Sequence, residues 1–141
     1  MLLHLYYSSG IILVDKSNKH LKELLDAWEA TYKKGQLTLW VFLALREGEK
    51  YVDEIHAFVS GRSKGTIVCE EQSLYRMLRK FRDLELVDFI TKPGVGGPDR
   101  KYYSLTETGQ ILLQRFSDRN MALFYDPEIM KLLFGTDKPS E

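Results

Sequence analysis

The chain has 141 residues, of which 44% are hydrophobic and 28% charged, a composition typical of one globular domain. Twenty Lys and Arg residues balance twenty Asp and Glu residues, so a net charge of zero gives no reason to expect general affinity for nucleic acid. The only cysteine, Cys69, excludes an internal disulfide and a cysteine-rich zinc site. A single cysteine is typical of proteins in a reducing cytoplasm, and we interpret Cys69 as a small, semi-buried residue rather than a redox switch.

Residues 1–14 are apolar, but Ser8-Ser9-Gly10 interrupts them, which excludes a membrane span, and they contain no convincing targeting signal. They could form a pair of short strands, pack as an arm on a second subunit, or be poorly ordered. We therefore assign residues 1–16 to an arm of unknown role. Ser17 or Asn18 is then expected to cap an amphipathic helix that ends before Gly35.

Two further helices are expected before the middle of the chain. Apolar residues surround the segment 37–45, which predicts a central buried helix. A second helix begins at Tyr51-Val52 and stops at Ser60-Gly61. The basic turn 61–66 is a candidate phosphate contact, and Ile67-Val68 is expected to form a short strand that pairs with a later hairpin.

The segment 72–84 has the pattern of a helix with two chemically different faces. Its apolar positions recur at helical spacing and are Leu74, Met77, Leu78, Phe81 and Leu84. The opposite side carries Gln72, Arg76, Arg79, Lys80 and Asp83. One face is therefore expected to pack on the core, while the other is free to contact a partner.

A β-hairpin is expected directly after this helix. Residues 87–91 and 101–105 are rich in β-branched and aromatic side chains, and the Gly- and Pro-rich segment 93–99 cannot continue either strand. Residues 74–101 contain seven basic and four acidic residues, which leaves a local charge of +3. A cationic helix followed by such a hairpin predicts a winged helix-turn-helix, in which the helix enters the major groove of DNA.

The same region resembles a known family. The matching motifs are Leu74-Tyr75, Leu78-Arg79-Lys80, Leu86-Val87, Gly96-Gly97-Pro98, Arg100-Lys101-Tyr102-Tyr103 and Leu105-Thr106-Glu107-Thr108-Gly109, within a resemblance that covers residues 35–110. They are similar to the PadR family of transcriptional regulators. Arg76 stands where the family usually has proline, Glu85 where it usually has glycine, and Asp99 is inserted.

The resemblance carries several expectations about function. It implies a homodimer built by the terminal helices, and in some relatives a site for small aromatic compounds or drugs between the subunits. Trp28 and Trp40 could line such a site, although core or dimer positions are the more common role of tryptophan. The sequence of residues 81–109 is most similar to the cyanobacterial branch of the family, and this resemblance implies a circadian clock gene as the target.

The C-terminal part is expected to contribute to the dimer. Thr106 should cap a helix, Asp126-Pro127 should begin a short one, and Gly135 should end it. Residues 121–135 are unusually apolar for the end of a chain, so we assign them to a dimerisation helix and residues 136–141 to a loose tail. The expected dimer contacts are Leu21, Leu25, Trp28, Phe124, Ile129, Leu132 and Leu133.

We predict a mainly α fold with a small β-hairpin wing (α+β), a winged helix-turn-helix with extra N- and C-terminal helices, whose DNA-binding domain is residues 17–120. The residues expected to read bases are Gln72, Ser73 and Arg76. The residues expected to contact the DNA backbone are Arg62, Lys64, Tyr75, Arg79, Lys80, Arg82, Lys92, Arg100 and Lys101. Tyr75 could equally pack against the wing.

Other functional classes have little support in the sequence. The three histidines are isolated from each other and from Cys69, and no nucleophile motif is present, so we expect neither an enzyme nor a metal or other cofactor. The expected function is a cytoplasmic homodimer that binds double-stranded DNA at a palindromic operator and represses transcription. A winged-helix module that binds a protein instead of DNA is the alternative.

Overall fold

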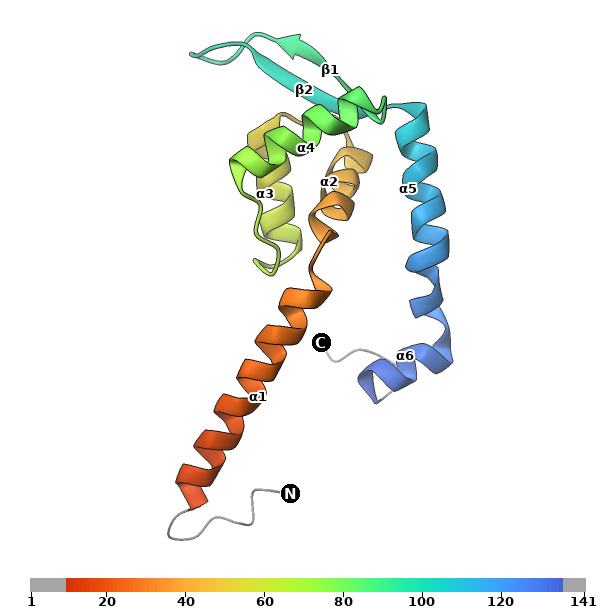
Figure 1. The fold of residues 1–141 in the computed structure, drawn as a ribbon. Helices are drawn as coiled ribbons and strands as arrows, with labels where there is room; N and C mark the ends of the chain where they lie inside the picture. The colour runs from red at the N-terminus through yellow and green to blue at the C-terminus, as the bar shows by residue number, and fades with distance from the viewer. Residues whose placement is uncertain (1–9, 136–141) are drawn as a thin grey trace. The chain divides into compact units, whose positions relative to one another are not determined.

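The computed structural model describes residues 10–135, and side chains from Ser17 onward (Figure 1). The chain forms two units, Met1–Leu37 and Thr38–Glu141, which are described separately. The elements in order are α1 (Gly10–Tyr32), α2 (Gln36–Glu47), α3 (Val52–Arg62), α4 (Glu71–Asp83), β1 (Val87–Lys92), β2 (Arg100–Leu105), α5 (Glu107–Asn120), the 3₁₀ helix η2 (Ala122–Tyr125) and α6 (Pro127–Phe134). None of these helices is long and apolar enough to cross a membrane.

Helix α1 begins earlier than the sequence predicted. Ser17 and Asn18, the expected caps, both lie inside the helix, which starts at Gly10. The β-branched residues between Gly10 and Ser17 therefore continue a helix despite their preference for strands. An ion pair of 2.8 Å joins Lys22 to Asp26 one turn later on its surface. The part of the predicted arm before Gly10, and the predicted tail 136–141, lie outside the described residues.

Helices α2, α3 and α4 form the core of the second unit. Two side chains from each helix have no exposed surface, namely Val41, Ala44, Ile55, Val59, Leu74 and Leu78. The rings of Phe42 and Phe81 also meet, with centroids 5.1 Å apart. Burial of one such aliphatic or aromatic side chain stabilises a fold by about 1.5–3 kcal/mol. The expectation that the segment 37–45 is a central buried helix is thus confirmed.

The two strands form an antiparallel hairpin whose register runs from Val87 opposite Leu105 to Lys92 opposite Arg100. The predicted third strand at Ile67-Val68 is wrong. Lys50 takes the other edge of β2 instead, through backbone hydrogen bonds of 3.0 and 2.8 Å with Tyr103. Ile67 is buried, and its N–H donates to Ser63 Oγ at 3.3 Å, so this backbone belongs to the turn after α3.

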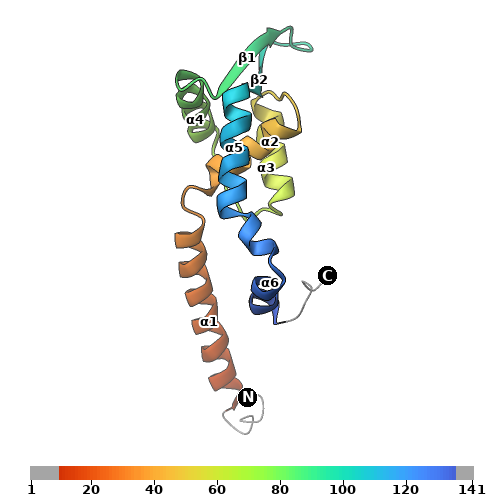
Figure 2. The ribbon, with the colours of Figure 1, turned by 90° about the vertical axis from the view of Figure 1, so that its right-hand side faces the viewer.

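Helix α5 begins as predicted and runs beside α2, where Arg46 donates a hydrogen bond of 3.3 Å to Gln114 (Figure 2). The Thr106 side chain accepts a hydrogen bond of 3.1 Å from the N–H of Gly109, which caps the helix. A Cβ on Gly109 would lie 2.2 Å from the carbonyl oxygen of Leu86, so only glycine permits this close approach. Asp126 caps α6, Pro127 is its first residue, and Gly135 ends it with a φ of 71°, also as predicted.

This arrangement confirms the predicted fold class. Three helices share the core, the third of them amphipathic with one exposed face, and a hairpin wing follows, with further helices on both sides in the chain.

Candidate nucleic-acid interface

The outer face of α4, defined here by Gln72, Arg76, Arg79 and Lys80, is exposed because the opposite face is anchored in the core. Leu74 and Leu78 are fully buried, and Phe81 is 6% exposed. Leu84 is an exception to the predicted apolar stripe, since it is 56% exposed. It occupies the C-cap position after the last helical turn, where the helical periodicity no longer applies.

The cations of this outer face are available to a partner. Within residues 10–135, the side chains of Arg76, Arg79 and Lys80 form no ion pair and no hydrogen bond with the protein. Of the residues predicted to read bases, Gln72 and Arg76 are exposed and Ser73 is half-buried. Unpaired cations on a rigid helix can bind an anion without first breaking an internal contact.

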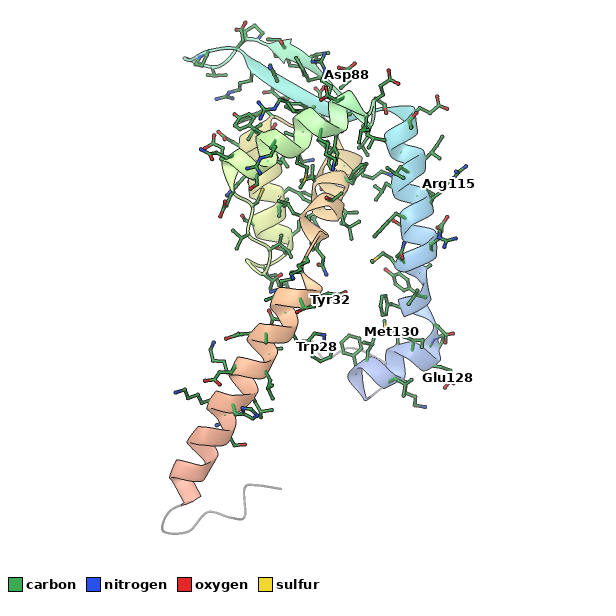
Figure 3. The ribbon with its side chains drawn as sticks, viewed as in Figure 1. Trp28, Tyr32, Asp88, Arg115, Glu128 and Met130 are labelled. Carbon is green, nitrogen blue, oxygen red and sulfur yellow. The ribbon has the colours of Figure 1, made fainter. Side chains whose placement is uncertain are left out.

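Arg82, one turn beyond this face, is held differently. Its Nε lies 3.4 Å from Asp88 Oδ1, and its guanidinium lies 4.2 Å from the centre of the Phe89 ring. Asp88 is at the junction of α4 and β1 (Figure 3). Lys101 Nζ lies 4.7 Å from the centre of the same ring. Arg82 therefore ties α4 to the wing, a contact that no sequence pattern indicated.

A second cluster lies at the tip end of the two strands and joins the hairpin to the loop between α2 and α3. Lys92 and Arg100 are direct partners in the register, and like charges in that position repel. Lys92 donates a hydrogen bond to Glu49, which raises the pKa of this lysine above its usual value, and it lies 4.5 Å from the Tyr102 ring centre. Arg100 lies 4.4 Å from the Tyr51 ring centre. One carboxylate and two aromatic rings thus offset the repulsion.

The structure does not bring Arg62 and Lys64 to the other predicted contacts. Helix α3 begins beside the wing, where the Tyr51 and Tyr102 rings are 5.4 Å apart. Its 11 residues span about 16 Å, so Arg62 ends the helix well away from the wing. Arg62 pairs with Glu47 at 3.1 Å. Lys64 follows in the turn, with a φ of 55°.

A groove of about 430 Å³ lies between the wing, the start of α3 and the exposed Tyr75 of α4. Its lining residues are Tyr51, Val52, Asp53, Tyr75, Gly97, Pro98, Asp99, Arg100, Lys101 and Tyr103. Tyr103 is 6% exposed, and burial raises the pKa of its hydroxyl. Tyr103 was not among the predicted contacts, although the two-residue period of a strand does place it on the same side as Lys101.

Cys69 and the predicted dimer residues occupy contrasting environments. Cys69 is 4% exposed, and burial raises the pKa of its thiol, so it is a core residue more deeply buried than expected. The predicted dimer residues are all at least partly exposed in the single chain: Leu21, Leu25, Trp28, Leu132 and Leu133 are exposed, and Phe124 and Ile129 are half-buried.

Several solved structures share this architecture. A PadR-like transcriptional regulator from Bacillus cereus is 25% identical, with a TM-score of 0.60 over 73% of this chain and 96% of its own. A Streptococcus transcriptional regulator is 28% identical, with a TM-score of 0.56 over 70% of this chain and 94% of its own. Bacillus subtilis PadR in complex with operator DNA shares the fold at 22% identity and a TM-score of 0.53, over 57% of this chain and 45% of its own.

A search of curated proteins by sequence finds no match. The family model described as the transcriptional regulator PadR-like family matches residues 41–115, which include α3, α4 and the whole wing. This match covers more than half of the chain. The chain therefore belongs to the PadR-like family of transcriptional regulators.

Proposed function

We propose that this protein is a sequence-specific DNA-binding regulator that works as a homodimer and represses transcription from a palindromic operator. One observation carries the proposal: the outer face of α4 presents Arg76, Arg79 and Lys80, none of which pairs with another described residue. In a winged helix-turn-helix, this face of the second helix enters the major groove. The operator DNA bound to the Bacillus subtilis relative supports the same use of the fold here.

Within this proposal, the start of α4 reads bases and the remaining cations bind phosphates. Gln72 and Arg76 can each form a bidentate pair, with adenine and guanine respectively, and such a pair is worth about 1–3 kcal/mol of discrimination. Ser73, at the edge of the face, can donate to or accept from a base. Arg79 and Lys80 lie further along the helix and bind the backbone. Lys101 and Arg100 add positive charge from the wing.

The homodimer is proposed from two apolar surfaces that a single chain leaves exposed. On α1, Trp28 is 74% exposed and Leu21 is 60% exposed. On α6, Leu132 is 81% exposed and Leu133 is 54% exposed. A second copy would cover these surfaces and would set two α4 helices about one DNA turn apart, roughly 34–36 Å, or a multiple of that distance.

Four further parts of the proposal rest on sequence. The domain assignment of residues 17–120 and 121–135 follows the expected division between DNA binding and dimerisation. A cytoplasmic location agrees with the single cysteine. A clock gene as the target, and an unidentified small-molecule effector near Trp28 and Trp40, rest only on the resemblance to relatives.

The test is a titration of the purified protein against genomic fragments, beginning with its own promoter, at two salt concentrations. We expect tight binding that survives competitor DNA and weakens steeply with salt, because neutralised phosphates release counterions. Binding that competitor removes, or no binding, would favour the protein-binding module instead.

A double charge reversal identifies the surface. Arg76→Glu with Arg79→Glu should abolish binding and leave folding and dimerisation unchanged. The matched control reverses Arg115 and Arg119, two exposed cations on α5 (Arg115 is labelled in Figure 3). If both double variants lose affinity equally, the outer face of α4 is not the reading surface.

A further inference from the structure

The groove beside Tyr103 lies where a DNA strand has to pass, if the proposed function is right. One sugar-phosphate strand separates each major groove from the adjacent minor groove. A protein with α4 in the major groove and its wing beside the minor groove therefore has that strand running between the two elements. The groove is lined by residues of both elements, Tyr75 from α4 and Arg100, Lys101 and Tyr103 from the wing.

The Tyr103 hydroxyl is a donor without an acceptor. No described residue accepts a hydrogen bond from it. In the described part of the chain, no side-chain nitrogen or oxygen is both fully buried and unpartnered, so this hydroxyl keeps an opening to solvent although the residue is 6% exposed. Tyr103 is one of the residues that line the groove.

The position of this donor is fixed before any partner arrives. The backbone N–H and carbonyl of Tyr103 both bond to Lys50, at 2.8 and 3.0 Å. The Tyr103 ring packs on the Phe89 ring, with centroids 5.5 Å apart. A preorganised donor loses little freedom on binding, so a hydrogen bond to an incoming group adds directly to affinity.

The surroundings of the hydroxyl favour an anion. Burial first, and then Tyr75, raises the pKa of Tyr103, so the hydroxyl stays protonated at neutral pH and keeps its donor proton. Arg82 and Arg79 also lie near this hydroxyl, and their positive charges lower its pKa. Arg100 and Lys101 line the groove together with Asp53 and Asp99, so the charges of the lining balance. Arg79 and Arg82 lie near the hydroxyl outside that lining, and Asp88 pairs with Arg82, so one net positive charge remains.

We propose that the Tyr103 hydroxyl donates a hydrogen bond to one phosphate of the DNA strand that runs between α4 and the wing. Tyr75 lines the same groove and approaches the same strand. A neutral donor of this kind anchors the backbone without releasing a counterion, which distinguishes its contribution from that of the cations.

The substitution Tyr103→Phe removes only the hydroxyl and keeps the ring on Phe89. We expect affinity to fall about tenfold, the usual scale for losing one hydrogen bond to a charged group. The loss should be equal for operator and unrelated DNA, and the salt dependence should not change. Tyr102→Phe is the matched control, because Tyr102 packs on Tyr51 outside the groove and should bind as the unchanged protein does.

Neutral methylphosphonates placed one at a time along the operator then locate the contact. A methylphosphonate at one position should lower the DNA affinity of the unchanged protein and cause no further loss of affinity in Tyr103→Phe. Additive losses at every position, or equal affinity of the two proteins, would overturn the inference. If the unchanged protein binds no DNA at all, the proposed function itself fails.

A free phosphate compound is the other source of the same chemistry. We compare how well inorganic phosphate and chloride, at equal ionic strength, displace DNA from each protein. The extra displacement by phosphate should be no greater for the unchanged protein than for Tyr103→Phe. Stronger competition against the unchanged protein would mean that the groove holds a free anion, which would also overturn the inference.

Discussion

Thr106 Oγ1 donates a hydrogen bond of 2.7 Å to the carbonyl oxygen of Glu85, while it accepts one of 3.1 Å from the N–H of Gly109. One hydroxyl thus fixes the turn between α4 and β1 and also caps α5. Glu85 has a φ of 61°, a left-handed conformation that few residues other than glycine adopt. The turn that aims the wing relative to α4 is therefore held by a side chain from beyond the hairpin.

Replacement of Thr106 tests this double contact. Thr106→Val keeps the shape but loses both hydrogen bonds, so we expect the free energy of unfolding to fall by about 1–2 kcal/mol. Thr106→Ser keeps the hydroxyl and should lose much less. Urea denaturation of the three proteins measures the difference, and equal losses for valine and serine would argue against the contact.

The backbone of Glu85 predicts a stabilising substitution. A side chain in the left-handed region costs about 1–2 kcal/mol that glycine avoids, although glycine also loses more entropy on folding. We expect Glu85→Gly to raise the free energy of unfolding by roughly 1 kcal/mol. Glu85→Gln keeps the Cβ and removes the charge, so it should leave stability unchanged. A gain for glutamine equal to that for glycine would mean that charge, not conformation, sets the cost.

Arg82 and Lys80 are close on α4 but should behave differently when replaced by alanine. Arg82→Ala removes the contacts with Asp88 and Phe89, so we expect a loss of stability of about 0.5–1 kcal/mol, the usual range for exposed contacts of this kind. Lys80→Ala should leave stability unchanged and lower the salt slope of DNA binding by about 1. Thermal unfolding and salt titration of both variants measure the two effects. The assignment fails if the two variants are alike in both measurements.

The dimer proposal predicts a variant that separates subunits without unfolding them. Trp28→Asp places a charge on an exposed apolar surface of α1, so we expect dimerisation to weaken at least tenfold while helix content stays the same. Val95→Asp is the control, because Val95 is 89% exposed at the tip of the wing. Sedimentation equilibrium measures both. A monomer at all concentrations before substitution would contradict the proposal.

Much of the interface region was predictable because its patterns are local. The separation of Leu74 and Leu78 from Arg76 and Arg79 follows directly from helical spacing, and the strands flank a segment that only a turn can accommodate. Which of the cations contact other residues of the protein was not predictable. Arg79 and Arg82 look equivalent in sequence, yet only Arg82 reaches Asp88 and Phe89.

Contacts made by single residues were also hidden from sequence. The bridge of Lys50 to Tyr103 involves one residue of a loop, which has no periodicity to detect, whereas Ile67-Val68 has the composition of a strand and forms none. Tyr102 and Tyr103 are likewise adjacent and identical in type. The structure shows that Tyr103 lies near residues of α4, while Tyr102 packs on Tyr51.

The base of the wing is closed from both sides, by the pairing of β1 with β2 and by the bridge from Lys50 to Tyr103. The bridge holds Tyr103 through a contact that does not involve the loop 93–99. A change in the length of that loop should therefore leave Tyr103 in place. The tip can thus be shortened, lengthened or exchanged as an independent part, while the framework beneath it keeps its own contacts.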